Sequence, residues 1–325
     1  MNWKKGIAVA LSAISIMAMV AGCGSNTATN DQKKIGVIQL VEHPSLDAAN
    51  KGFVDGLASK GYKDGENIKL DQQNAQADQS NLNSIAQRFV SDKKDLVLAI
   101  ATPSAQTMAN ASHDIPIMGS AITDYVTAKL VQSNEHPGGN VSGTSDMTPV
   151  EKEVDLIMAL VPNVKRIGAI YTSSEINSQL QVEKMKAYAA TKGITVVEAT
   201  VSNVNDIQQA ATNLVNQDVQ AIYTPTDNVL ASAMANLAQI TDAAKIPVFA
   251  ADEGMTMTGG VATYSVDYYK LGYQTGLMAA KVLSGEAKIS DLAIETQKDI
   301  KLTVNEERAK KLGITIPEAL RKDMK

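Results

Sequence analysis

Short apolar runs and longer amphipathic segments alternate along the chain from residue 35 onward. The short runs are typical of buried strands, and the segments between them carry apolar residues at helical spacing. Alternating strands and helices indicate parallel sheets covered by helices on both faces, which is an α/β fold. We predict strands at 35–40, 68–72, 96–101 and 115–122, and helices at 45–59, 81–91 and 105–111.

The same order recurs in the second half of the chain. The motif I-x-T-P occurs at Ile100 and again at Ile222, each time after an apolar run and before an Ala-rich stretch. An Ile-Pro pair, at Ile115 and at Ile246, is also followed both times by small residues and an acid. The repeat predicts two similar Rossmann-like lobes. The second has strands at 167–171, 195–201, 219–223 and 246–250, and helices at 178–192, 207–216 and 229–244.

The segment 137–149 between the two halves is rich in turn-forming residues. Its simplest interpretation is a turn that leads into a strand, but we favour a hinge at which the chain crosses between lobes. The helix predicted at 268–283 is surplus to the second lobe, so further crossings are expected near 263–267 and 300–305. The predicted domains are 35–145 with 267–298 for lobe one, and 146–266 with 299–325 for lobe two.

The first residues have the pattern of an export signal. A basic start is followed by an apolar stretch at 6–19, too short for a comfortable transmembrane helix, and by small residues before Cys23. Cys23 is the sole cysteine, which excludes an internal disulfide and a cysteine metal cluster. The sequence V-A-G-C resembles the bacterial lipobox, which implies a signal peptide at 1–22, a lipid on Cys23 and a flexible tether at 23–34. An uncleaved anchor is the alternative.

Charge and motifs exclude several classes of protein. The formal net charge is −5, and the basic residues are scattered, so nucleic acid is not an expected partner. The three histidines lack zinc-site spacing, and no nucleophile elbow or phosphate-binding loop occurs. We therefore expect no metal, no cofactor and no enzymatic activity.

Polar turns follow most of the predicted strands. In open α/β sheets the carboxyl ends of the strands are the edge at which ligands bind. Some of these turns also fit helix capping boxes, at 172–175 and 224–227, so they are equally consistent with helix caps. A carboxylate in a closed cleft needs a cation such as an ammonium group, which singles out Asp227. The candidate ligand-binding residues are His43, Ser45, Thr102, Pro103, Ser104, Thr123, Asp124, Ser173, Ser174, Asn177, Asp227, Asn228 and Asp252.

Several of these turns carry a resemblance to a known family. The segments HPSLD, IATPSAQ, AITD, PGGNVSGTSD, YTSSEINS and PTDN, which begin at residues 43, 100, 121, 137, 171 and 225, are similar to solute-binding lipoproteins of ABC importers. The similar family is the tryptophan or tyrosine transporter substrate-binding proteins. The resemblance implies a type I periplasmic-binding fold, in which two lobes joined by a three-crossover hinge close on a ligand.

The resemblance also implies a function for the turns. An aromatic amino acid would place its carboxylate against Thr102 and Ser104, with Thr123 nearby, and its ammonium against Asp227. Ser173, Ser174 and Asn177 would close over it from lobe two. A monomer anchored on the outer face of the cell membrane would then deliver the ligand to ABC permease subunits. A lipid-anchored sensor acting through a membrane receptor and a bilobal enzyme are the alternatives.

Overall fold

The computed structural model describes residues 32–324. The predicted signal peptide, Cys23 and most of the predicted tether lie outside these residues. The described part contains two main sheets, each made of parallel strands, with helices packed around them. The α/β fold with parallel sheets predicted from the sequence is therefore confirmed.

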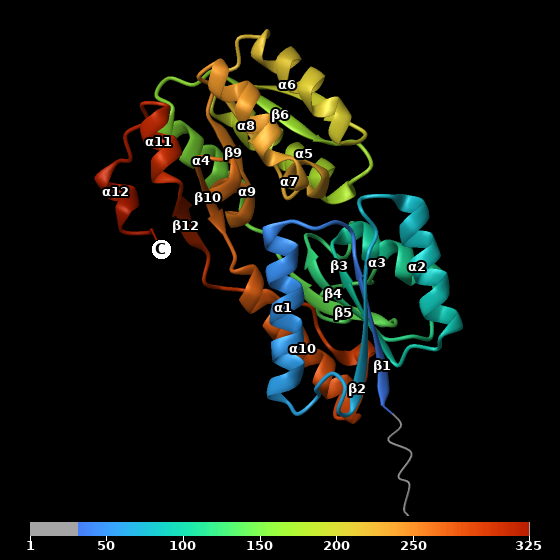
Figure 1. Ribbon diagram of the computed structural model, residues 1–325. Helices are drawn as coiled ribbons and strands as arrows, with labels where there is room; N and C mark the ends of the chain where they lie inside the picture. Colours follow the sequence, from blue (N-terminus) through green and yellow to red (C-terminus); the bar gives the residue numbers. More distant parts are fainter. Residues whose placement is uncertain (1–31, 325) are drawn as a thin grey trace, which may run out of the picture. The chain divides into compact units, whose positions relative to one another are not determined.

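The first sheet has six strands in the order β11-β5-β4-β3-β1-β2. Helices α1 and α10 lie against one of its faces, and α2 and α3 against the other (Figure 1). This sheet and these helices are called the first region below. Its elements are β1 (Lys33–Gln39), α1 (Pro44–Ser59), β2 (Ile68–Asn74), α2 (Gln79–Ser91), β3 (Leu96–Ile100), α3 (Thr102–Ala111), β4 (Ile117–Ile122), β5 (Val141–Ser145), α10 (Tyr268–Ser284) and β11 (Glu295–Thr296).

The second region is built on a four-stranded sheet, in the order β7-β6-β8-β9, and an antiparallel pair, β10 and β12. The strands are β6 (Arg166–Thr172), β7 (Thr195–Val201), β8 (Ala221–Thr224), β9 (Val248–Ala250), β10 (Ala262–Ser265) and β12 (Lys301–Val304). The helices are α4 (Val150–Leu160), α5 (Ile176–Thr191), α6 (Ile207–Val215), α7 (Asn228–Ser232), α8 (Met234–Ala243), α9 (Glu253–Thr258), α11 (Glu306–Lys311) and α12 (Glu318–Arg321).

Each region has its own apolar core, because a parallel sheet buries both of its faces. All residues of β3 and β4 are buried, and they belong to one cluster with the inner faces of α1 and α10. In the second region, two clusters occupy the two faces of the sheet, one towards α4 and α5 and the other towards α6 and α8.

The chain passes between the regions at three places, and two differ from the sequence prediction. Val141–Ser145 is strand β5 of the first sheet, so the expected hinge at 137–149 begins only after it. Most of 300–305 is β12, and the third passage precedes it. The helix predicted at 229–244 is also divided, because Ala233 leaves helical geometry between α7 and α8.

Helices α1 and α10 touch backbone to backbone. A Cβ atom added to Gly272 would lie 1.8 Å from the carbonyl oxygen of Ala49, and one added to Gly52 would lie 2.0 Å from the carbonyl oxygen of Tyr269. Only glycine permits this approach. The contact holds α10 on the first region, although the strand before it belongs to the second.

We predict that Gly272→Ala lowers the free energy of unfolding by about 1–3 kcal/mol, because a methyl group forces the two helices apart. The matched control is Gly139→Ala, where an added Cβ has no atom within 4 Å. The control should change stability by less than about 0.5 kcal/mol. Urea denaturation of both variants measures the difference, and equal midpoints would contradict the packing argument.

Candidate functional site

The carboxyl ends of strands from the two regions meet and share hydrogen bonds. Ser45, at the start of α1, donates its hydroxyl to Oδ1 of Asp252, which follows β9, over 2.7 Å. Thr123, after β4, and Thr226, after β8, share a hydroxyl–hydroxyl bond of 3.0 Å. The polar turns predicted on separate strands are therefore brought together in one cleft.

The cleft is closed around a cavity of about 10 Å³. Such a volume suits about one water molecule, whereas small-molecule sites measure roughly 300–1,000 Å³. The cavity is therefore too small for a ligand of that size in this closed arrangement. The cavity is lined by His43, Leu46, Ala121, Asp146, Thr226, Asp227, Asn228, Asp252 and Tyr268.

Asp227 is fully buried and its carboxylate is already saturated. One oxygen accepts hydrogen bonds from the Thr172 hydroxyl at 2.8 Å and the Leu230 amide at 2.9 Å. The other accepts from the Thr172 amide at 2.6 Å and the Ser178 hydroxyl at 2.8 Å. Burial raises the pKa of Asp227, and these donors oppose the rise. Of the two interpretations left open by the sequence, the structure favours the helix cap, here at the start of α7.

Neither capping-box pattern in the sequence forms as a box, although Asp227 itself caps α7. The Thr172 hydroxyl bonds Asp227 instead of capping α5, and the N-cap residue of that helix, Glu175, makes no side-chain cap. The Thr224 hydroxyl is buried without a hydrogen-bond partner among residues 32–324. The hydrogen bond that forms instead, between Thr172 and Asp227, joins the ends of separate strands, and the spacing of residues in the sequence does not reveal it.

A second buried carboxylate, Glu175, organises the edge of the cleft. It accepts hydrogen bonds from the side-chain amides of Asn228, at 2.5 Å, and Asn177, at 3.1 Å. Burial, reinforced by the charge of Asp227, raises the pKa of Glu175. Because the Asn228 amide nitrogen faces Glu175, its oxygen faces Nε2 of His43, 3.4 Å away.

Burial lowers the pKa of His43 below its ordinary value and favours the neutral imidazole, although the charges of Asp252, Asp47 and Asp227 oppose the shift. Its Nε2 then donates the hydrogen bond to Asn228, which leaves Nδ1 as an acceptor. This Nδ1 atom is buried and has no hydrogen-bond partner in the described part of the chain. His43 therefore offers an acceptor to the cavity that it lines.

Asp146 is a cleft residue that the sequence analysis missed. Its side chain is only 3% exposed, and its Oδ2 accepts a hydrogen bond from the Tyr268 hydroxyl at 2.8 Å. Its Oδ1 has no partner within residues 32–324. Burial raises the pKa of Asp146 to about 6, the charge of Asp252 adds to the effect, and the Tyr268 and Thr123 hydroxyls oppose it. Two signals pointed to it: it ends the segment PGGNVSGTSD that carries the family resemblance, and it follows β5, a stretch that we had interpreted as a hinge.

The first region contributes buried hydroxyls to its strand ends. Thr102, Ser104 and Ser120 lie at the ends of β3 and β4, and their hydroxyls lack hydrogen-bond partners in the described chain. Pro103, half-buried, occupies the first turn of α3. The chain enters α3 through Ala101, whose φ of 78° and ψ of 152° are rare outside glycine. This strained corner places Thr102 and Ser104 at the edge of the sheet.

Of the predicted residues, His43, Asp227, Asn228 and Asp252 line the cavity, and three others lie away from the cleft altogether. Ser173 and Ser174 are exposed, and the Ser173 hydroxyl donates to the carbonyl of Val201 on the neighbouring strand β7. Asp124 is half-buried and accepts a hydrogen bond from the Thr127 amide within its own turn, at 2.8 Å. The residues that do gather at the cleft are His43, Ser45, Thr123, Asn177, Asp227, Asn228 and Asp252.

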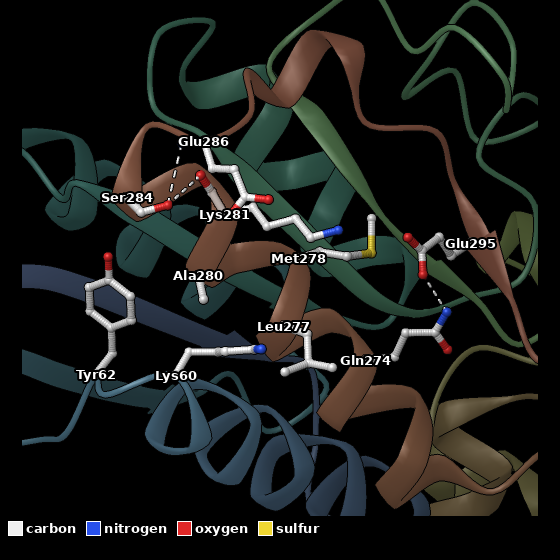
Figure 2. Close-up of a pocket in the computed structure, with 10 residues that line it drawn as sticks. All are labelled: Lys60, Tyr62, Gln274, Leu277, Met278, Ala280, Lys281, Ser284, Glu286 and Glu295. Atoms are coloured by element: carbon white, nitrogen blue, oxygen red, sulfur yellow. Dashed lines mark hydrogen bonds between the residues drawn. The ribbon is translucent and has the colours of Figure 1, made fainter.

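A larger groove of about 400 Å³ lies elsewhere, between the end of α1 and helix α10 (Figure 2). Gln274 donates to Glu295 across one side of it, at 2.5 Å. None of the strand-end residues reaches this groove. It is lined by Lys60, Tyr62, Gln274, Leu277, Met278, Ala280, Lys281, Ser284, Glu286 and Glu295.

Two further searches of residues 32–324 bear on the class of protein. Among these residues, no group of three or more His, Cys, Asp or Glu side chains is arranged to hold a metal ion. No helix in the same part of the chain combines the length and the apolar character needed to cross a membrane.

We predict that Asp227→Asn lowers the free energy of unfolding by about 2–4 kcal/mol, because an amide group cannot accept from all four donors and leaves buried donors unpaired. The matched control is Asp78→Asn at the exposed cap of α2, which accepts only the Asn81 amide. Asn and Asp are nearly equivalent at such caps. Thermal and urea unfolding compare the variants, and similar losses would show that Asp227 is an ordinary cap.

The chain is similar to a family of known proteins and to several of their solved structures. The family model described as ABC transporter substrate binding protein matches residues 34–325. A tyrosine-binding protein of Clostridioides difficile is 44% identical over 322 residues, which cover 96% of this chain and 93% of that protein.

Solved structures agree. An ABC domain of Streptococcus pneumoniae in complex with L-Trp has a TM-score of 0.86 and 43% identity, over 90% of this chain and 98% of that one. The ligand-free, open structure of a substrate-binding protein with adhesive properties from Clostridium difficile has a TM-score of 0.67 and 46% identity, with the same coverage. A myo-inositol-bound solute-binding protein of Bacillus halodurans, 18% identical with a TM-score of 0.62 over 88% of this chain and 99% of that one, shares the fold. The chain belongs to the ABC transporter substrate-binding protein family.

Proposed function

We propose that this protein captures an aromatic amino acid between two lobes and delivers it to the permease of an ABC importer. The observation that carries the proposal is the meeting of two strand edges around buried polar groups that lack partners within the described chain. The named ligands of two relatives, tyrosine and L-Trp, favour an aromatic side chain. The lobes are 35–145 with 267–298, and 146–266 with 299–325.

The ligand's carboxylate fits the first region. Thr102 and Ser104 offer buried hydroxyls at the start of α3, where backbone N–H groups and the helix dipole favour an anion. The residues lining the cavity include no Lys or Arg. The carboxylate therefore relies on hydroxyl and amide donors, as the family resemblance implied, and the ring stacks on Pro44, Pro103 or a tyrosine.

The lobes close because some contacts form only when the carboxyl-end edges of the two sheets come together. The Ser45–Asp252 and Thr123–Thr226 bonds join the regions in this closed form. The higher TM-score with the L-Trp complex than with the ligand-free, open relative, at similar identity, supports this interpretation. A ligand that touches both edges shifts the equilibrium towards the closed form, because its contacts differ between the two states.

The larger groove beside α10 is a weaker candidate for this ligand. Its charged groups are half-buried or exposed, and no buried unpartnered polar atom of the described chain belongs to its lining. The strand-end cleft concentrates such atoms, which is why we assign the ligand there.

We further propose that the protein is exported and held at the outer face of the cell membrane by a lipid on Cys23. The polar segment after Cys23 is short of apolar residues and suits a tether. A tethered binding protein remains near its permease, which raises their effective concentration.

The ligand assignment is tested by thermal shift of the mature protein. L-tyrosine, L-tryptophan or L-phenylalanine at about one hundred times Kd should stabilise the fold by about 2.7 kcal/mol, because the ligand binds only the folded state. L-alanine, a zwitterion without a ring, and myo-inositol are the controls. If no aromatic amino acid raises the melting temperature, the ligand assignment fails while the fold stands.

The lipid anchor is tested by labelling cells with radioactive palmitate. The wild type should incorporate label, and Cys23→Ala should not, because the chain contains no other cysteine. Membrane fractionation provides an independent measurement. Equal labelling of both proteins would exclude Cys23 as the site of acylation.

A further inference from the structure

We infer that Asp146, rather than Asp227, supplies the counter-charge for the ligand's ammonium group, and that Tyr268 couples this contact to the hinge. The inference rests on the proposed function, since it concerns an amino acid in the same cleft. It assigns to Asp146 a specificity role that the sequence pattern had given to another residue.

The three carboxylates that line the cavity differ in the hydrogen bonds that their oxygens accept. Asp227 accepts four hydrogen bonds, two at each oxygen. Asp252 accepts from the Ser45 hydroxyl and the Met255 amide at the same oxygen, Oδ1. Asp146 has one oxygen bonded to Tyr268 and the other, Oδ1, buried without a partner in the described chain. A buried carboxylate oxygen in that state is the one best able to accept a ligand N–H.

The charge around the cavity calls for a cation. Its lining contains the carboxylates of Asp146, Asp227 and Asp252 and the neutral imidazole of His43, but no basic side chain. Burying like charges together is costly unless a positive group pairs with them. An α-ammonium group supplies one charge and three donors, and the unpartnered Nδ1 of His43 is a second acceptor on the same cavity.

The position of Asp146 connects ligand binding to the passages between the regions. Asp146 directly follows β5, where the chain first leaves the first sheet, and Tyr268 begins α10, just after the second passage. The hydrogen bond from the Tyr268 hydroxyl to Oδ2 of Asp146 thus bridges two of the passages. A ligand that pulls on Oδ1 acts directly on the segments that must rotate when the lobes close.

The experiment compares L-tyrosine with 3-(4-hydroxyphenyl)propionate, which lacks the ammonium group, by calorimetric titration of the mature protein. Asp146→Asn should weaken tyrosine about 10- to 100-fold, as expected for loss of a charged hydrogen bond, and should leave the propionate within about threefold. The wild-type preference for tyrosine should largely disappear. If Asp146→Asn weakens both ligands equally, the residue is structural and the inference is wrong.

Further variants sharpen the test. The exposed-cap control Asp78→Asn should keep the preference for tyrosine over the propionate, whereas a preference lost in folded Asp227→Asn but retained in Asp146→Asn would overturn the assignment. Tyr268→Phe should keep the preference but reduce the ligand-induced compaction measured by small-angle X-ray scattering. Unchanged compaction in Tyr268→Phe would contradict the proposed coupling between ligand binding at Asp146 and the hinge.

A pH series provides a measurement that does not depend on any variant folding. Burial in the closed cleft raises the pKa of Asp146 to about 6, and Asp146 must be ionised to pair with the ammonium, so tyrosine affinity should fall as the pH falls below about 6. Protonation of His43, at the start of α1, acts in the same direction, and the other facing groups are Asp227, Asp252 and Tyr268. Propionate affinity should not fall with it. Parallel profiles for the two ligands would contradict the inference.

Wild-type protein that binds no aromatic amino acid would overturn the proposed function, and this assignment with it. Wild-type binding that persists unchanged in Asp146→Asn overturns only the assignment. The two failures are therefore distinguishable in one set of titrations.

Discussion

A carboxylate removed from water needs hydrogen-bond donors, and this requirement organises the cleft. Asp227 satisfies it by joining β6 to α7, and Glu175 satisfies it by holding Asn228 and Asn177. Both residues therefore fix the edge of the second region before any ligand arrives. Asp146 satisfies it only in part, through Tyr268, so the fold itself distinguishes structural carboxylates from one available to a ligand.

The parallel sheets explain why these groups meet at all. Parallel strands place all of their carboxyl ends at one edge, so a polar turn after each strand contributes to the same surface. The glycine contact between α1 and α10 then holds a helix encoded late in the chain against the first sheet. As a result, Tyr268 at the start of α10 lies within hydrogen-bond distance of Asp146 at the end of β5.

Much of the fold, but less of the site, could be predicted from the sequence. Apolar runs such as β3 and the repeated I-x-T-P corners gave the strands and their order. Strand β5 was not predicted because its residues, V-S-G-T-S, are mostly small and polar. It is buried through a close approach of Gly143 to Gly119. Because β5 was not predicted, Asp146, which follows it, was not included among the candidate ligand-binding residues. The role of Asp227 depends on Thr172 and Ser178, which are remote in sequence, so spacing alone could not distinguish a cap from a ligand contact.

The two sides of the cleft are prepared differently, and this asymmetry favours an order of events. On the first region, Thr102 and Ser104 keep unpartnered polar atoms in the described chain, as does Asp146 at the first passage between the regions, and Ala101 is held in a strained conformation that costs about 1–3 kcal/mol. On the second region, the carboxylates of Asp227 and Glu175 are saturated, whereas the Thr224 hydroxyl and the Asn177 side-chain oxygen are buried without partners in the described chain. The ammonium group of the proposed ligand therefore finds an acceptor at Asp146 and not at the carboxylates of the second region. In the proposed function, the second region then closes with the hydrogen bonds of its two carboxylates already formed, so that these bonds need little rearrangement.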